Sequence, residues 1–373
     1  MIVRVAILKC ADYSRERVDR AVREIFELLG GIGHFVQKGQ KVLLKPNMLS
    51  AKEPERGITT HPIFLETVVR QVQSAGGEVW IGDSPSGAIK GIQRYWKNTG
   101  FEDVAKRTGA KLINFEAGGT VIRETSLRKF HLARSIFEAD VIINLPKFKT
   151  HGFTLYTGAI KNLFGTIPGL QKAVLHKRYP HPDSFSKMLV DVYSLVNAKL
   201  HLMDGIVGME GNGPVTGDLR QIGLILASED GVALDAVASH IMGFQEGKID
   251  AIRLAAEKGL GEARLDNITI LGELLDEVKC KEFSLPSNYF IKLVPQCFMR
   301  WLGRLIWVHP RADLDKCTAC GMCVRSCPVH AIHMVNGYPV TDYHICINCL
   351  CCNESCPEGA VIQERSWLAR RLG

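Results

Sequence analysis

The feature that most limits the fold is a spacing of cysteines that occurs twice near the carboxyl end. Residues 317–328 read CTACGMCVRSCP, and residues 346–357 read CINCLCCNESCP. Each run has the pattern Cys-x2-Cys-x2-Cys-x3-Cys-Pro once Cys351 is left out of the second run. A short loop with thiolates three residues apart reaches three corners of a cubane, and a proline after the fourth cysteine ends the loop. The sequence therefore predicts a small region folded around two inorganic centres.

This spacing resembles that of bacterial-type ferredoxins, in which the fourth thiolate of each run crosses to the other 4Fe-4S cluster. The crossover predicts two 4Fe-4S clusters, one on Cys317, Cys320, Cys323 and Cys356 and the other on Cys346, Cys349, Cys352 and Cys327. Both runs are followed by an apolar Ala-Ile or Ala-Val pair, which supports a duplicated module over residues 313–362. Zinc sites are the alternative, although zinc ribbons separate two Cys pairs by a longer loop. We expect Cys351 to be a buried neighbour of a cluster.

The other cysteines and the amino terminus indicate a reducing compartment. Of the 12 cysteines, only Cys10, Cys280 and Cys297 lie outside the two runs, so a disulfide framework is not expected. The first residues, MIVRVAILKCADYS, have no apolar run of signal-peptide length and are typical of a first strand. No segment has transmembrane length without charge. These observations predict a cytoplasmic protein.

Apolar runs of strand length alternate with helical patterns over residues 1–287. There are eight such runs, several of them rich in Val and Ile and apolar on both faces, and five segments between or after them have apolar residues at helical spacing. Strands that alternate with helices predict an α/β fold with a mostly parallel, doubly wound sheet. We expect this large domain to be followed by a connector over 288–312, a small ferredoxin-like α+β module over 313–362 and a tail over 363–373.

Polar residues gather where predicted strands end, and ligands of such sheets bind beyond the carboxyl ends of the strands. Residues 144–180 contain six Lys and Arg residues and no Asp or Glu, and they carry glycines and prolines rather than a helical stripe. We interpret 144–169 as a glycine-bearing loop that binds a carboxylate or phosphate. The glycine-dense stretch 208–217 would allow a ligand close to the backbone.

The candidate residues of this site fall into two groups. The predicted substrate-binding residues are Lys45, Asn47, Asp83, Ser84, Lys147, Lys149, Lys161, Asn162, Glu210, Gly211 and Gly213. The predicted proton donors are His151 and His176, because imidazole titrates near neutral pH. The alternatives are structural: either histidine as a hydrogen-bonded side chain, His61 as a helix cap, and Asp83 or Asp204 as caps of helices or turns.

Residues 288–309 mix aromatic and aliphatic side chains with Lys and Arg, and Pro295 interrupts any long helix there. We expect this connector to pack the small module onto the large domain, with its arginines extended to solvent. Contact with a membrane surface is the alternative, which we do not favour.

Several motifs of the large domain, in order, closely resemble the family known as domain of unknown function 362, which is often fused to a two-cluster ferredoxin module. They are KPN at 45–47, GDSP at 82–85, NLPKFKTH at 144–151, TGAIKNLFG at 157–165, DGIVGMEGNGPVTG at 204–217 and DGVALDAVASHIMG at 230–243. The resemblance covers residues 40–245 and the module. It implies a redox-linked protein, without indicating a substrate.

These features together predict an iron-sulfur oxidoreductase. The module would accept single electrons from a low-potential donor or a redox partner protein and pass them to an anionic small molecule at the strand ends. No nicotinamide fingerprint is present, because GGIGHF at 30–35 follows a helix rather than a strand. The second hypothesis is an electron carrier or docking protein without catalysis on this chain. Nucleic-acid binding is not expected, although the net charge is +7, because basic residues do not alternate with stacking aromatics.

Overall fold

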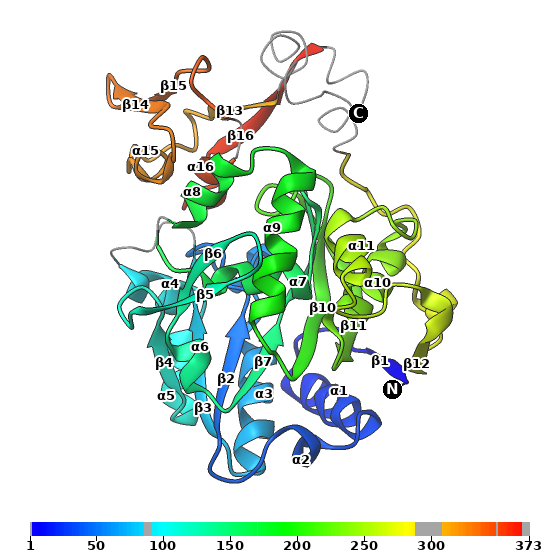
Figure 1. Cartoon of the computed structure of the whole chain (residues 1–373). Coiled ribbons are helices and arrows are strands. Elements are labelled where there is room, and N and C mark those ends of the chain that lie inside the picture. Colours follow the sequence, from blue (N-terminus) through cyan, green and yellow to red (C-terminus); the bar gives the residue numbers. More distant parts are fainter. Residues whose placement is uncertain (1, 86–90, 170, 288–307, 348–349, 368–373) are drawn as a thin grey trace.

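The computed structural model describes residues 2–85, 91–169, 171–287, 308–347 and 350–367 of the chain. It contains a large α/β domain and a small module formed by the carboxyl-terminal part of the sequence (Figure 1). The module lies at the end of the molecule toward which the arrow of β2 points. The predicted connector lies mostly outside the described residues, because 288–307 are not among them.

The large domain is built on a 10-stranded sheet whose main path runs β12-β1-β11-β10-β7-β2-β3-β4. Along this path only β11 is antiparallel to its neighbours β1 and β10. The other neighbouring strands are parallel. The strands of the path are β12 (Ile268–Gly272), β1 (Val3–Lys9), β11 (Asp218–Ser228), β10 (Leu200–Glu210), β7 (Val141–Leu145), β2 (Lys41–Pro46), β3 (Glu78–Asp83) and β4 (Lys111–Asn114). All eight predicted strands are present, so the predicted α/β class is confirmed.

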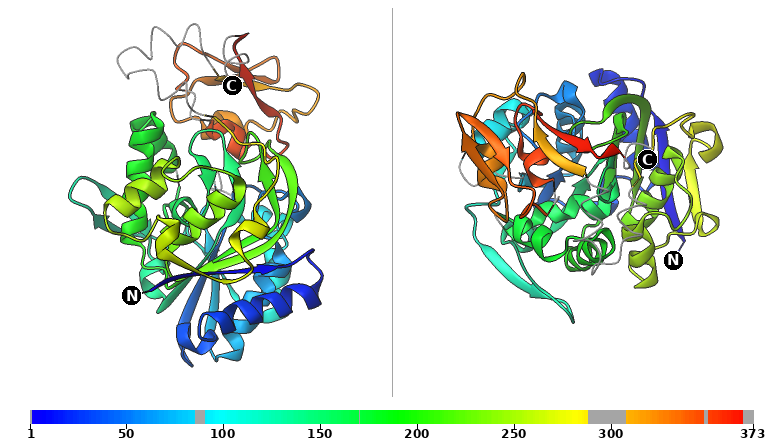
Figure 2. Two further views of the ribbon diagram at one scale, coloured as in Figure 1. Left: turned by 90° about the vertical axis from the view of Figure 1, so that its right-hand side faces the viewer. Right: turned by 90° about the horizontal axis from the view of Figure 1, so that it is seen from above.

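Helices cover both faces of the sheet, which explains why its strands are apolar on both sides. In β2, Val42 and Leu44 join the core on one face, whereas Leu43 joins the core on the other. The first face is covered by α1 (Arg15–Leu28), α2 (Ile32–Phe35), α3 (Pro62–Ser74), α4 (Ile92–Asn98) and α5 (Phe101–Thr108). The second face is covered by α6 (Ser135–Glu138), α7 (Ala159–Asn162), α8 (Gln171–Arg178), α9 (Pro182–Leu195), α10 (Gly231–Met242), α11 (Asp250–Glu257) and α12 (Leu275–Val278). Figure 2 shows the two layers from the side and from above.

Three short 3-10 helices and two further pairs of strands complete the domain. The 3-10 helices are η1 (Pro54–Arg56), η2 (Leu163–Thr166) and η3 (Leu265–Asn267), and β5 (Thr120–Glu124) forms a hairpin with β6 (Lys129–Ala133). The segment interpreted as a loop instead begins with two strands, β8 (Lys147–His151) and β9 (Leu155–Thr157), which pair with each other while β8 also pairs with β10. All five residues of β8 are buried, so its lysines are internal rather than exposed.

The module contains two small antiparallel pairs and two short helices. Its elements are β13 (Val308–Ala312), α15 (Met322–Ser326), β14 (Ile332–Val335), β15 (Tyr338–Thr341), α16 (Cys351–Ser355) and β16 (Val361–Arg365), with β13 paired to β16 and β14 to β15. The two apolar pairs that follow the cysteine runs, Ala331-Ile332 and Ala360-Val361, form its core together with cysteines. β13 and β16 extend the folded module beyond the predicted range of 313–362 at both ends.

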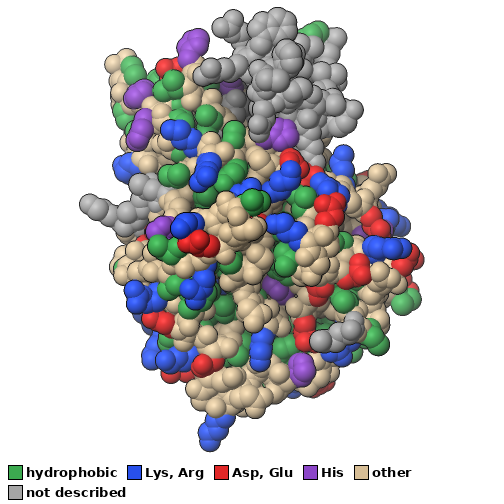
Figure 3. Space-filling model, viewed as in Figure 1, with side chains coloured by type: hydrophobic (Ala, Val, Ile, Leu, Met, Phe, Trp, Pro, Cys, Tyr) green, Lys and Arg blue, Asp and Glu red, His purple; other side chains and the backbone are tan. Residues whose placement is uncertain are grey.

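The surface of the large domain carries both signs of charge. Figure 3 shows lysine and arginine side chains interspersed with acidic ones on the face drawn. In the part of the chain that the structure describes, no helix is long and apolar enough to cross a membrane.

Candidate functional site

A cavity of about 790 Å³, which includes its opening to solvent, lies between the strand ends of the large domain and the module. Most of its wall comes from the large domain, and Ser326 and Cys351 come from the module. Its described lining residues are Lys45, Asn47, Met48, Leu49, Asp83, Ser84, Pro85, Lys149, His151, Thr157, Lys161, Asn162, Phe164, Gly165, Gly169, Lys172, Ala173, His176, Pro214, Ser326 and Cys351. The residues predicted at the ends of β2 and β3 therefore meet at this cavity, and β8, which was not predicted as a strand, adds Lys149 and His151.

Lys45 and Asp83 form a buried ion pair at the base of the cavity. Lys45 Nζ lies 2.8 Å from Asp83 Oδ1, and the two side chains are 1% and 5% exposed. Burial lowers the pKa of Lys45, while the charge of Asp83 opposes this effect. Asp83 also accepts backbone hydrogen bonds from Met48 and Ser84, so it caps a turn as well as pairing with the lysine. A Cβ atom at Gly165 would lie 2.1 Å from Asp83 Oδ1, so the pair requires glycine at that position.

A network of asparagines fixes the wall beside this ion pair. Asn47 Nδ2 donates to Asn162 Oδ1 at 3.0 Å, and Asn162 Nδ2 donates to Asn144 Oδ1 at 2.8 Å. Lys149 Nζ donates to Asn47 Oδ1 at 3.0 Å and to the carbonyl of Ile58 at 2.7 Å. Each amide therefore has a defined orientation. Because these hydrogen bonds hold the Lys149 ammonium at the cavity wall, it is a fixed positive charge there.

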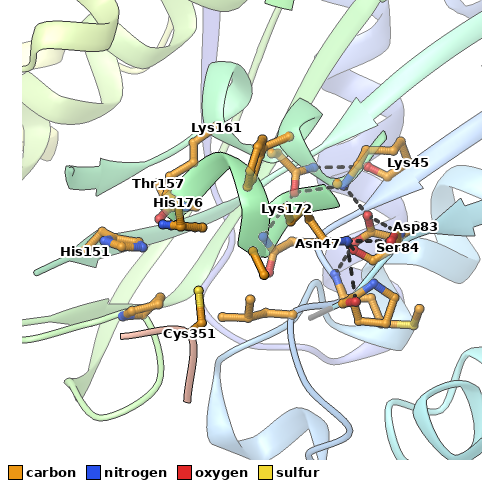
Figure 4. A pocket seen from close by; sticks show the side chains of 18 of the residues that line it. Lys45, Asn47, Asp83, Ser84, His151, Thr157, Lys161, Lys172, His176 and Cys351 are labelled. Carbon is orange, nitrogen blue, oxygen red and sulfur yellow. Dashed lines mark hydrogen bonds and ion pairs between the residues drawn. The ribbon is translucent and has the colours of Figure 1, made fainter. Parts of the chain in front are cut away.

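Lys161 and Lys172 also line the cavity, and Figure 4 shows them together with Lys45. Lys172 donates to both the carbonyl and the hydroxyl of Ser84, and that hydroxyl donates to Glu116. Lys172 belongs to the basic run in the sequence, but it was not among the predicted site residues. Among the described lining residues, four lysines face a single aspartate, so the cavity is positively charged.

The two candidate histidines both line the cavity, in different surroundings. His151 Nδ1 accepts backbone hydrogen bonds from Phe153 at 3.1 Å and Thr154 at 3.4 Å. In the neutral ring the proton is therefore on Nε2. His176 is 4% exposed and stacks on Phe185, with ring centroids 4.3 Å apart. Both imidazoles are held in place, His151 by backbone hydrogen bonds and His176 by aromatic packing.

Four of the predicted substrate-binding residues do not line the cavity, and Lys147 is the clearest correction. Its ammonium lies 2.8 Å from Asp204 Oδ2 and donates to the hydroxyl of Tyr13 at 2.6 Å. Tyr13 in turn stacks on His61, with ring centroids 3.6 Å apart. The charge of Lys147 is thus neutralised inside the protein. Tyr13 was not predicted to belong to this group, because nothing in its local sequence indicates contact with a residue so distant along the chain.

The glycine-dense stretch 208–217 contributes only Pro214 to the cavity. Glu210 instead forms an ion pair with Arg220 at 3.6 Å and accepts a hydrogen bond from the backbone of Ser284. Gly211 also bonds to Ser284, and a Cβ atom at Gly213 would lie 2.2 Å from the carbonyl of Thr150. These glycines serve close packing of the chain against itself. The alternative that His61 caps a helix is confirmed, since its side chain accepts from Ile63 at the start of α3.

The four cysteines predicted to hold the first cluster lie close together in the module. Cys317, Cys320, Cys323 and Cys356 line one small cavity together. Burial, aided by the nearby Cys356, Cys320 and Cys317, raises the pKa of the Cys323 thiol to about 11. Among the described residues, no group of three or more His, Cys, Asp and Glu side chains is arranged to hold a single metal ion. Four thiols around a shared cavity fit the corners of a 4Fe-4S cluster.

The structure describes three of the four cysteines of the second set. Cys327, Cys346 and Cys352 pack in the module core, and Cys349 lies outside the described residues. The backbone N–H of Ala331 donates to Cys327 Sγ at 3.1 Å, and that of Ala360 donates to Cys356 Sγ at 3.2 Å. Hydrogen bonds of this kind stabilise thiolates that hold iron-sulfur clusters. Their equivalent placement supports the duplication inferred from the sequence.

Cys351 is buried, as predicted, and its sulfur points into the large cavity (Figure 4). It directly precedes Cys352, and Ser326 directly precedes Cys327. Both module residues that line the cavity are therefore adjacent in sequence to cysteines of the second set. Lys52 of the large domain, whose pKa is lowered by burial, also lies near Glu358 and Cys356 of the module.

Comparisons with known proteins agree with this division of the chain. The model of the family described as domain of unknown function (DUF362) matches residues 42–240, and that of the 4Fe-4S binding domain matches residues 310–333. A thylakoid-associated protein of Synechocystis sp. is 36% identical over 263 residues, which cover 70% of this chain and 80% of that protein. The cytoplasmic location inferred from the cysteines remains a prediction.

Two solved structures show distant similarity. The lactate racemase apoprotein from Thermoanaerobacterium thermosaccharolyticum is 12% identical with a TM-score of 0.40, and the match covers 64% of this chain and 57% of that one. A protein from Thermotoga maritima is 13% identical with a TM-score of 0.38, over 67% of this chain and 60% of that one.

Proposed function

Because the chain belongs to the family described as domain of unknown function (DUF362) and also contains a 4Fe-4S binding domain, we propose that it is an iron-sulfur oxidoreductase. The 4Fe-4S binding domain gives the chain an iron-sulfur electron-transfer role. The proposal adds a second cluster and a substrate. The module holds two 4Fe-4S clusters, and an anionic small molecule bound in the large cavity receives the electrons.

The observation that carries the proposal is the position of Ser326 and Cys351 in the cavity wall. They neighbour Cys327 and Cys352, which are ligands of the second cluster in the predicted arrangement. When bound, this cluster would supply single electrons at the edge of the cavity. A separate electron-carrier module would need no cavity shared with the α/β domain.

The residues of the cavity would bind and orient the substrate. Lys149, Lys161 and Lys172 provide positive charge, and Asn47 and Asn162 are fixed by their hydrogen bonds. Preorganised positive charge stabilises negative charge that develops on a substrate during reduction. His151, whose Nδ1 accepts two backbone hydrogen bonds, would deliver a proton from Nε2, and His176 is the second candidate donor.

The test begins with protein purified without oxygen. We expect iron and sulfide sufficient for two 4Fe-4S clusters in each chain, and partial reoxidation of the reduced protein by a small acidic metabolite. Lys161→Ala should slow this reoxidation at least about tenfold, since it removes a charge from the cavity wall. Lys187→Ala is the matched control, because Lys187 is half exposed and pairs with Asp183 on the surface of α9. Equal effects of the two substitutions would contradict the proposed cavity.

A further inference from the structure

The hydroxyl of Thr157 is the most informative group of the cavity that the proposed function leaves unexplained. Thr157 ends β9, is 3% exposed and lines the cavity. Its Oγ1 atom is buried and has no hydrogen-bond partner in the part of the chain that the structure describes. Buried hydroxyls almost always have a partner, because an unmade hydrogen bond costs free energy. A ligand is a natural source of the missing partner.

The surroundings of Thr157 indicate which kind of atom that partner is. Thr157 is the cross-strand partner of Lys149, and Lys161 follows it by four residues in α7. Figure 4 shows Thr157 and Lys161 on the same side of the cavity as His176. Thr157, Lys149 and Lys161 line the same cavity, and two lysines in the wall beside an unpartnered hydroxyl favour a ligand atom that accepts hydrogen bonds and carries negative charge. An oxyanion meets both conditions.

The apolar residues of the cavity wall indicate what kind of molecule carries the oxyanion. The apolar part of the lining includes Met48, Leu49, Phe164, Ala173 and Pro214. A free phosphate ion would leave these side chains without an apolar partner, whereas an organic acid would cover them. An acceptor of single electrons also needs a conjugated or aromatic system, because a saturated chain has no low-energy orbital to receive them.

We infer that the cavity binds an unsaturated or aromatic carboxylate, with its carboxylate at the Thr157 hydroxyl and its apolar body toward Phe164 and the module. The conjugated body rests on the proposed function, since only an electron acceptor requires it. The carboxylate position rests on Thr157 and the lysines alone. Thr157 is thereby a residue that determines ligand specificity.

The test measures binding of benzoate and cinnamate by calorimetry to the anaerobically purified, cluster-loaded protein in its oxidised state. Thr157→Val keeps the shape of the side chain and removes the hydroxyl, so we expect binding to weaken about tenfold. Thr157→Ser keeps the hydroxyl and should bind much like the wild type. Because the hydroxyl has no partner without ligand among the described residues, Thr157→Val should be at least as stable as the wild type.

Thr59→Val is the matched control. Its hydroxyl is also buried without a partner among the described residues, but Thr59 is not among the lining residues of the cavity. This variant should bind both acids as the wild type does. Unchanged binding by Thr157→Val, no binding of either acid to the wild type, or tighter binding of inorganic phosphate than of both acids would overturn the inference. If the acids bind as expected but do not reoxidise the reduced protein, the inference stands and the proposed reductase function fails for these acids.

Discussion

Two buried lysines, Lys45 and Lys147, each pair with a buried aspartate, and the pair of Lys45 and Asp83 can be used to measure how much such pairing stabilises the fold. Asp83→Leu leaves the Lys45 ammonium buried without a counter-ion, so we expect the free energy of unfolding to fall by about 3–5 kcal/mol. The double variant Lys45→Met with Asp83→Leu should recover part of that loss. Urea denaturation without oxygen, followed by circular dichroism, measures both. The exposed pair of Lys106 and Glu102 is the control, with an expected effect below about 1 kcal/mol.

The buried His201 makes stability depend on pH in a defined direction. Burial lowers the pKa of His201 to about 3, whereas an unfolded histidine has a pKa of about 6.5. Between these values the unfolded chain binds a proton that the folded chain does not, so stability falls as the pH drops below about 6.5. At pH 5 this loss is about 2 kcal/mol.

His201→Gln tests this pH dependence. The difference in unfolding free energy between pH 7 and pH 5 should shrink by about 2 kcal/mol in the variant. Above pH 7 the variant and the wild type should change in parallel. An undiminished loss of stability at pH 5 in the variant would show that His201 is not the group responsible.

The sequence predicted which residue types gather at the strand ends, but not how they pair. Lys147 and Lys149 are two residues apart and look equivalent in the sequence. In the structure one pairs with Asp204, 57 residues away, and the other bonds to Asn47, 102 residues away. These partners are determined by the order of the strands in the sheet, which a local sequence pattern does not reveal. Lys147 was therefore wrongly placed in the ligand site, and Thr157 was not predicted to belong to it.

Strands were predictable where both of their faces are buried, because such a strand appears in the sequence as a long apolar run. The strands β1, β2, β3, β7 and β10 are of this kind, whereas the five longer helices were predictable from apolar residues at helical spacing. The strand β8 was not predicted, because its sequence KFKTH puts charged side chains where a buried strand normally has apolar ones. Its lysines can be buried because Lys147 pairs with Asp204, and Lys149 donates hydrogen bonds to Asn47 and to the carbonyl of Ile58.

The turn between β8 and β9 is one of the places where the large domain contacts the module. A Cβ atom at Gly152 would lie 3.4 Å from Gln363 Oε1 in β16, so alanine nearly fits and a large side chain does not. We expect Gly152→Phe to displace the module while leaving iron content unchanged. Alkylation of Cys351, measured by mass spectrometry, should rise because this thiol is 4% exposed in the wild type. Gly152→Ala is the control, and similar alkylation in both variants would contradict the contact.

For the whole molecule, the duplicated cysteine spacing was sufficient to predict the module and the apolar pairs of its core. It did not indicate where the module packs, because all the cysteines predicted to hold the clusters lie within the module and require no residue of the large domain. The extra cysteine, Cys351, was the one available signal, since a residue that is out of register for a cluster can face another surface. Its position in the cavity wall connects the two parts of the chain into one proposed site.

The central claim is that two clusters lie in the module and that the second one is close to the ligand cavity. Electron paramagnetic resonance of the fully reduced protein, with and without benzoate, tests it most directly. We expect a spectrum of two magnetically interacting 4Fe-4S clusters, with the features of one cluster changed by the ligand. A spectrum of one isolated cluster, or two clusters both unaffected by bound benzoate, would contradict it.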